Sequence, residues 1–234
     1  AVHRSEGKTA AEAMAKRLQQ EAPTILSQLA SADLSRVTTE QALGALDDAT
    51  SVDETTKALD DLVSLAEYSV RVGKTVAVGE LLTGVVEREG RLKDGDMKRA
   101  YVMSVRRMSK PVLLRAVATL IPKKPERRQQ YYDILVRTGE EGADALIEQI
   151  TQAPTADDRK RLFEVLTELE MAVPALKRML GDSRWFVVRN AADLLGEMVA
   201  TQAEGALIAL LRHSDDRVRR SATNALLRLG TPEA

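Results

Sequence analysis

The chain has 234 residues, of which 44% are hydrophobic and only 3% aromatic, with 13 glycines, 7 prolines and no cysteine. This composition disfavours a β-sandwich or barrel and excludes disulfides and thiolate metal sites, so we expect an all-α protein of the cytoplasm without a cofactor. The net charge of −1 conceals a basic segment, residues 91–137, which carries 13 basic and 4 acidic residues between two acidic flanks. No stretch is apolar enough to span a bilayer, so we expect no membrane partner.

The first half of the chain shows long amphipathic stretches and only a weak repeat. Gly73 and Gly90 are expected to end two of its helices. We predict an irregular helical region over residues 1–110 that is continuous with the repeats after it. Apolar periodicity places its helices near residues 9–21, 24–30, 37–48, 54–72, 75–89 and 94–109.

Residues 111–234 carry a repeat that becomes clearest towards the C-terminus. A single shift of 31 residues aligns two apolar stripes, so that Ala175 falls on Ala206 and Ala191 on Ala222. Each unit reads as a short helix, a polar turn and a longer helix, and roughly four such units fit this region. Such helix pairs bury their apolar faces on one another, which predicts an antiparallel α-solenoid. Prolines are expected to mark helix starts at Pro111, Pro125 and Pro174 and a helix end at Pro122.

The segment 175–182, followed by 187–198, resembles a short HEAT repeat of the kind also found in bilin lyases. The pattern returns over 211–230, and the resemblance is best over 172–230. It implies a right-handed α-α superhelix of the HEAT/armadillo type, whose second helices line a concave face and hold another macromolecule. The family includes scaffolds, transport receptors, lyases and a class of DNA glycosylases, so the resemblance leaves the function open.

The polar residues of the two clearest units depart from the family pattern. HEAT repeats typically place an Asp in the turn and an Arg early in the second helix. The first unit has Asp182 and Val188 at these positions, and the second has His213 and Arg219. We therefore predict that Asp182 and Arg219 pair across the interface between the units.

Two short motifs suggest catalysis but have simpler explanations. Gly73-Lys74-Thr75 resembles the end of a phosphate-binding loop, but Tyr68 stands where the first glycine of that loop belongs, so a helix stop is favoured. His213-Ser214-Asp215 contains the residue types of a hydrolase triad. Adjacent residues cannot form the hydrogen-bonded line of a triad, so Ser214 or Asp215 is expected to cap the next helix.

Aromatic and basic side chains are the candidates for binding a partner. Trp185 and Phe186 form either a buried plug against the preceding unit or part of a binding edge. Three of the four tyrosines, Tyr101, Tyr131 and Tyr132, lie in the basic segment, where they would either stack on nucleic-acid bases or, for Tyr131, join the core. The candidate partner-binding residues are Arg106, Arg107, Lys110, Lys123, Lys124, Arg127, Arg128, Trp185, Arg189, Arg219 and Arg220.

These features favour a non-catalytic scaffold that binds another protein, as part of a larger bacterial protein. One alternative is a nucleic-acid-binding solenoid that uses residues 91–137. The other is a lyase or chaperone for a tetrapyrrole, which would need a pocket for that ligand. No catalytic or metal-binding residue is predicted.

Overall fold

The computed structural model describes residues 34–230, and every regular element among them is a helix, which confirms the expected all-α solenoid. The helices predicted near 9–21 and 24–30 lie outside the described residues. The helices are α2 (Thr39–Asp48), α3 (Val52–Arg71), α4 (Thr75–Arg91), α5 (Asp96–Met108), α6 (Pro111–Lys123), α7 (Arg128–Thr138), α8 (Glu140–Thr151), α9 (Ala156–Glu168), α10 (Ala172–Met179), α11 (Trp185–Glu197), α12 (Glu204–Leu210) and α13 (Asp216–Leu229).

Local sequence signals set many of the helix ends. A capping box begins α2, where the Thr38 side chain accepts the Gln41 amide and the Gln41 side chain accepts the Thr38 amide. Ser51 and Glu54 form the same arrangement at the start of α3. Gly230 ends α13 in the left-handed region at a φ of 61°, where a side chain would be strained.

Three of the residues that were predicted to start or end a helix lie inside a helix instead. Pro111 does begin α6, but Pro174 is the third residue of α10 and Pro122 lies inside α6, one residue before its end. Gly90 also lies inside a helix, because α4 continues to Arg91. A proline is tolerated in the first turn of a helix because the amide there has no intrahelical acceptor.

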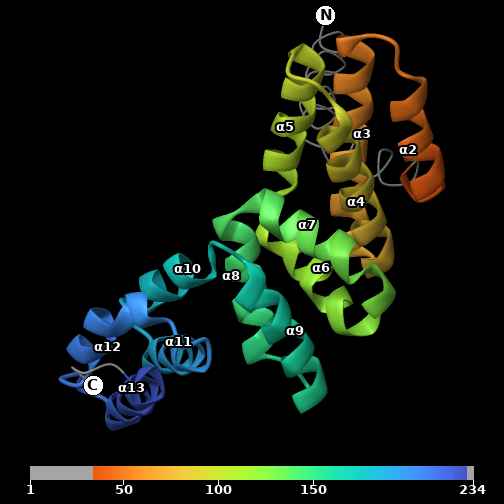
Figure 1. The fold of residues 1–234 in the computed structure, drawn as a ribbon. Coiled ribbons are helices and arrows are strands. Elements are labelled where there is room, and N and C mark those ends of the chain that lie inside the picture. The colour runs from red at the N-terminus through yellow and green to blue at the C-terminus, as the bar shows by residue number, and fades with distance from the viewer. Residues whose placement is uncertain (1–33, 231–234) are drawn as a thin grey trace, which may run out of the picture.

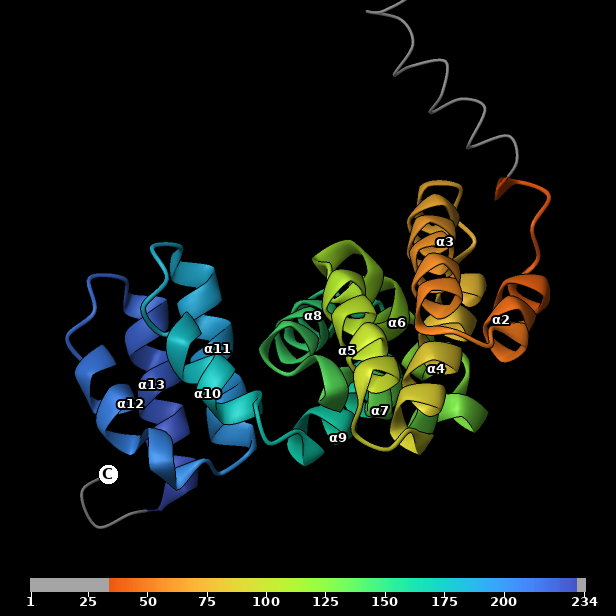
Figure 2. The same ribbon diagram turned by 90° about the horizontal axis from the view of Figure 1, so that it is seen from above.

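Among residues 34–230 the helices form six consecutive pairs, from α2–α3 to α12–α13, whose order along the molecule can be followed in Figures 1 and 2. The buried side chains of these pairs form one hydrophobic core. In the centre the first helices of successive pairs, α4, α6 and α8, pack side by side. At the two ends the second helices pack more closely, α3 on α5 and α11 on α13. Packing also continues across residue 110, because α4 contacts both α6 and α7. Within residues 34–230, none of these helices has the length and apolar character needed to cross a membrane.

Candidate interaction surface of the C-terminal pairs

In the turns before α11 and α13, two different side chains accept a hydrogen bond from the backbone amide two residues further on. Asp182 Oδ1 accepts the backbone amide of Arg184 at 2.8 Å. In the next unit, His213 Nδ1 accepts the amide of Asp215 at 3.0 Å. The imidazole therefore replaces the carboxylate as acceptor, and the repeat offset that places His213 on Asp182 is confirmed by this matching geometry.

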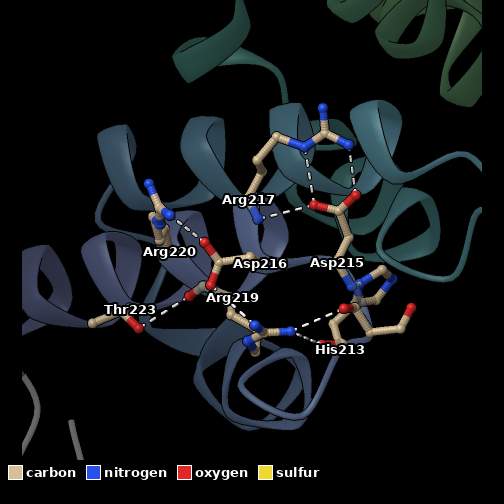
Figure 3. Close-up of polar contacts among 8 residues, drawn as sticks. His213, Asp215, Asp216, Arg217, Arg219, Arg220 and Thr223 are labelled. Carbon is tan, nitrogen blue, oxygen red and sulfur yellow. Dashed lines mark hydrogen bonds and ion pairs between the residues drawn. The ribbon is translucent and has the colours of Figure 1, made fainter.

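In each turn an arginine side chain also donates hydrogen bonds to the aspartate two residues before it. Arg184 makes two side-chain hydrogen bonds to Asp182, and Arg217 makes two to Asp215, which also caps α13 by accepting the Arg217 amide (Figure 3). These charge-assisted hydrogen bonds lower the pKa of Asp182 and of Asp215 to about 2. Helix capping by Asp215 is thus confirmed.

The predicted pairing of Asp182 with Arg219 is wrong, because each side chain is satisfied within its own unit. Asp182 is bound by Arg184. The Arg219 guanidinium donates to the carbonyl oxygens of His213 and Ser214 at 2.8 and 3.0 Å and to Asp216 at 3.0 Å (Figure 3). Arg219 therefore ties the start of α13 to the turn before it.

Trp185 and Phe186 are the first two residues of α11, and their side chains differ in exposure and in contacts. The Trp185 ring is half-buried, with the Arg217 guanidinium carbon 3.3 Å from its centroid and that of Arg189 at 5.8 Å. Arg217 belongs to α13, so Trp185 joins α11 to the following unit rather than plugging the preceding one. Phe186 is 45% exposed and meets the Trp185 ring edge-on, with centroids 6.0 Å apart.

Phe186 lines a cavity of about 360 Å³ between α8 and α11. Asp144 and Glu148 of α8 lie on one side of this cavity, and Asn190 of α11 lies on the other. Burial raises the pKa of Asp144, although both its oxygens accept hydrogen bonds from Arg178 at 2.7 Å. The wall therefore combines one exposed aromatic ring with carboxylates and an amide.

The basic segment is paired with both acidic flanks. Towards the N-terminus its cations reach α3 and α4, and towards the C-terminus they reach α8 and α9. The excess positive charge of residues 91–137 is thus offset by neighbouring helices, and much of it serves contacts between them. The pairs are Arg107–Asp60, Lys110–Glu67, Arg115–Glu148, Arg127–Glu80, Arg128–Glu168 and Arg137–Glu89.

The tyrosines of the basic segment do not form a surface on which nucleic-acid bases could stack. Tyr101 and Tyr131 are buried in the core, and burial raises the pKa of both phenols. Tyr132 donates its hydroxyl to the Glu168 carbonyl at 3.1 Å. The core position expected for Tyr131 is confirmed. The candidate cations with no ion-pair partner among residues 34–230 are Arg106, Lys123 and Lys124.

Two further features were considered as candidate chemistry, the Gly73-Lys74-Thr75 motif and possible metal ligands. Gly73 has a φ of 75° at the end of α3, as expected for a helix stop, and Lys74 precedes α4. No group of three or more His, Asp or Glu side chains within residues 34–230 is arranged to hold a metal ion.

The family comparison concerns the same two helix pairs as this surface. A family model described as HEAT repeats matches residues 173–234. The resemblance found in the sequence is therefore confirmed where it was clearest, and α10–α13 form two consecutive HEAT units. A search of curated proteins finds no matching sequence.

Solved structures give only distant similarity. An engineered protein is 15% identical, with a TM-score of 0.35, over 82% of this chain and 96% of its own. Human deoxyhypusine hydroxylase in complex with glycerol is also 15% identical, with a TM-score of 0.30, over 88% of this chain and 99% of its own. At these TM-scores neither likeness carries an inference about this chain.

Sequence reasoning missed several residues of this surface. Arg217 was not among the candidate residues, although the spacing Asp-x-Arg occurs in both turns, at 182–184 and 215–217. That recurrence was a usable signal. The cavity beside Phe186 had no signal in the sequence, because it depends on the distance between α8 and α11 in the fold.

Proposed function

We propose that this chain is a non-catalytic scaffold that binds another protein through the HEAT units of α10–α13. The observation that carries the proposal is the cluster of Trp185, Phe186 and the arginines around them, beside the cavity between α8 and α11. Exposed aromatic and arginine side chains are enriched among the residues that dominate protein-binding energy.

The cluster is held in place before any partner arrives. Trp185 is covered by Arg217, which is itself fixed by two hydrogen bonds to Asp215. Phe186 projects from the first turn of a helix rather than from a loop. A side chain that is already ordered loses less conformational entropy on binding, so this arrangement favours affinity.

A protein partner is also favoured by the environment of the basic segment. A polyanion site needs cations free to neutralise phosphates, and stacking needs accessible rings. Most candidate cations there are already paired with carboxylates, and Tyr101 and Tyr131 are buried. We place this scaffold in the cytoplasm of a bacterium, and a chain without cysteine needs no oxidising compartment to form disulfides.

Site-specific photocrosslinking in the native host tests this proposal. A photoreactive benzophenone side chain replaces Phe186, and in a matched control it replaces Met103, which is 56% exposed on α5. We expect discrete protein adducts from position 186 that are missing from position 103. Nucleic-acid adducts, or the same adducts from both positions, would contradict the proposal.

A further inference from the structure

The cavity of about 360 Å³ between α8 and α11 lies well inside the described range, with lining residues from Asp144 to Ala191. α8 packs against α6, α9 and α10, whereas α11 packs on α10 and α13 and is not packed closely on α8. The volume is at the lower end of the range for small-ligand sites, about 300 to 1,000 Å³. The cavity therefore suits one inserted side chain rather than a whole helix.

The lining of the cavity is partly apolar and includes an accessible aromatic ring, Phe186, which is 45% exposed. The repeat shift of 31 residues places Arg217 at the position of Phe186, so the repeat does not require an aromatic side chain there. Such a lining can cover the methylene stem of a long side chain, and an exposed ring attracts a cation. The other apolar lining residues, which are buried or half-buried, are Ile147, Met179, Val187 and Ala191.

The α8 side of the cavity carries more carboxylates than cations. Four carboxylates fall within an arc of about 100° around α8, at 3.6 residues per turn, on the side that lines the cavity. Among residues 34–230 two arginines pair with them: Arg178 is shared by two of the carboxylates, and Arg115 pairs with a third. The fourth, Glu141, has no ion-pair partner in that range. The four carboxylates are Glu140, Glu141, Asp144 and Glu148.

The opposite wall does not supply the missing positive charge. Arg184 lines the cavity beside Phe186, but its guanidinium is held by two hydrogen bonds to Asp182. This neutral pair leaves four carboxylates against two arginines, a net charge of −2. Burial raises the pKa of Asp144, and the charges of the two neighbouring glutamates raise it further, as expected where negative charge is in excess.

We propose that the cavity between α8 and α11 receives an arginine side chain of the partner protein, with Asp144 and Glu148 as its carboxylate acceptors and Phe186 as its aromatic wall. This inference rests on the proposed protein-binding function and names the chemistry of the partner. A planar guanidinium can donate to a carboxylate through two nitrogens and can also lie over a ring. The excess of carboxylates would repel a phosphate or an acidic side chain.

NMR titration of the full chain with two small probes tests the inference. One probe is N-acetylarginine amide, and the other is N-acetylcitrulline amide, which has nearly the same shape but no charge. Methyl signals of Ile147, Met179 and Val187 report occupancy, because these side chains line the cavity. We expect saturable shifts with the arginine probe at a dissociation constant of about 1 mM, and binding of the citrulline probe weaker by about tenfold or more.

Three variants separate binding in the cavity from a structural effect. Glu148→Gln removes an acceptor and should weaken binding of the arginine probe by about fivefold or more. Arg115→Ala removes the cation that now pairs with Glu148 and should tighten binding by about threefold. The matched control is Glu168→Gln, which replaces an exposed carboxylate that pairs with Arg128 away from the cavity and should leave binding unchanged.

Equal affinity for the two probes would overturn the inference. So would an affinity that Glu148→Gln leaves unchanged, or an Arg115→Ala variant that binds no more tightly than the unaltered chain. The photocrosslink at position 186 is scored separately. If it survives while the arginine probe fails to bind, only this inference has failed and the proposed protein-binding function stands.

Discussion

Glu89 is the one buried carboxylate among residues 34–230, and its pairing with Arg137 joins α4 to α7. The Arg137 guanidinium donates to both oxygens, at 2.6 and 3.0 Å, while the Glu89 side chain is only 6% exposed. Since a buried charge without its partner lowers stability, breaking this pair should cost more than breaking the exposed pairs around it.

We expect Arg137→Ala to lower the free energy of unfolding by about 2 to 3 kcal/mol, because it leaves the Glu89 charge buried and unpaired. Arg115→Ala breaks a more exposed pair with Glu148 and should cost about 0 to 1 kcal/mol. Urea unfolding of the two variants measures both values. Equal losses would show that burial of Glu89 does not matter.

The Asp215 carboxylate should report the hydrogen bonds from Arg217. Its folded-state pKa of about 2 lies below the usual 3.8, so its contribution to stability is complete above the unfolded-state pKa and is lost as the pH falls towards 2. Arg217→Gln removes the charge and should raise the pKa towards 3.8. Carbon-detected NMR titration measures it, and a pKa that stays near 2 in the variant would assign the shift to another cause.

At the scale of elements, α11 and α13 of successive units cross in close backbone contact at Gly196. We expect Gly196→Ala to destabilise the chain by about 1 to 3 kcal/mol, since the new methyl group meets the Ala225 backbone and overpacking outweighs the better helix propensity of alanine.

Gly44 provides the control for that substitution. It lies within α2, and a Cβ there meets nothing within 4 Å. Gly44→Ala should therefore stabilise the chain by about 0.5 to 1 kcal/mol, in keeping with propensity alone. If Gly196→Ala were also stabilising in thermal and urea unfolding, the helices would not be in the close contact described.

The sequence predicted elements better than it predicted the contacts between them. Apolar periodicity placed α3 and α11 within a few residues of their observed ends, because burial of one face imposes that spacing. It could not pair Arg137 with Glu89 or separate Asp182 from Arg219, since those contacts depend on crossing geometry between helices. The Asp-x-Arg turns, by contrast, could be read locally, because both residues of each pair lie in one segment.

At the scale of the whole molecule, the basic segment and its acidic flanks are separate in the sequence, but their side chains form ion pairs in the fold. Cations of residues 91–137 reach carboxylates on α3, α4, α8 and α9, so the uneven sequence pattern serves packing between units. Removing such cations should therefore weaken the fold before it weakens any attraction for a polyanion.

The most direct test of this account combines DNA titration with unfolding of one variant. Alanine replaces Arg106, Arg107, Arg127 and Arg128, of which the last three pair with carboxylates on other helices. Labelled duplex and single-stranded DNA are titrated at two salt concentrations against both chains. We predict weak binding that the variant barely changes, together with a loss of about 1 to 2 kcal/mol in unfolding free energy. Micromolar or tighter binding at physiological salt that disappears in an equally stable variant would contradict the account.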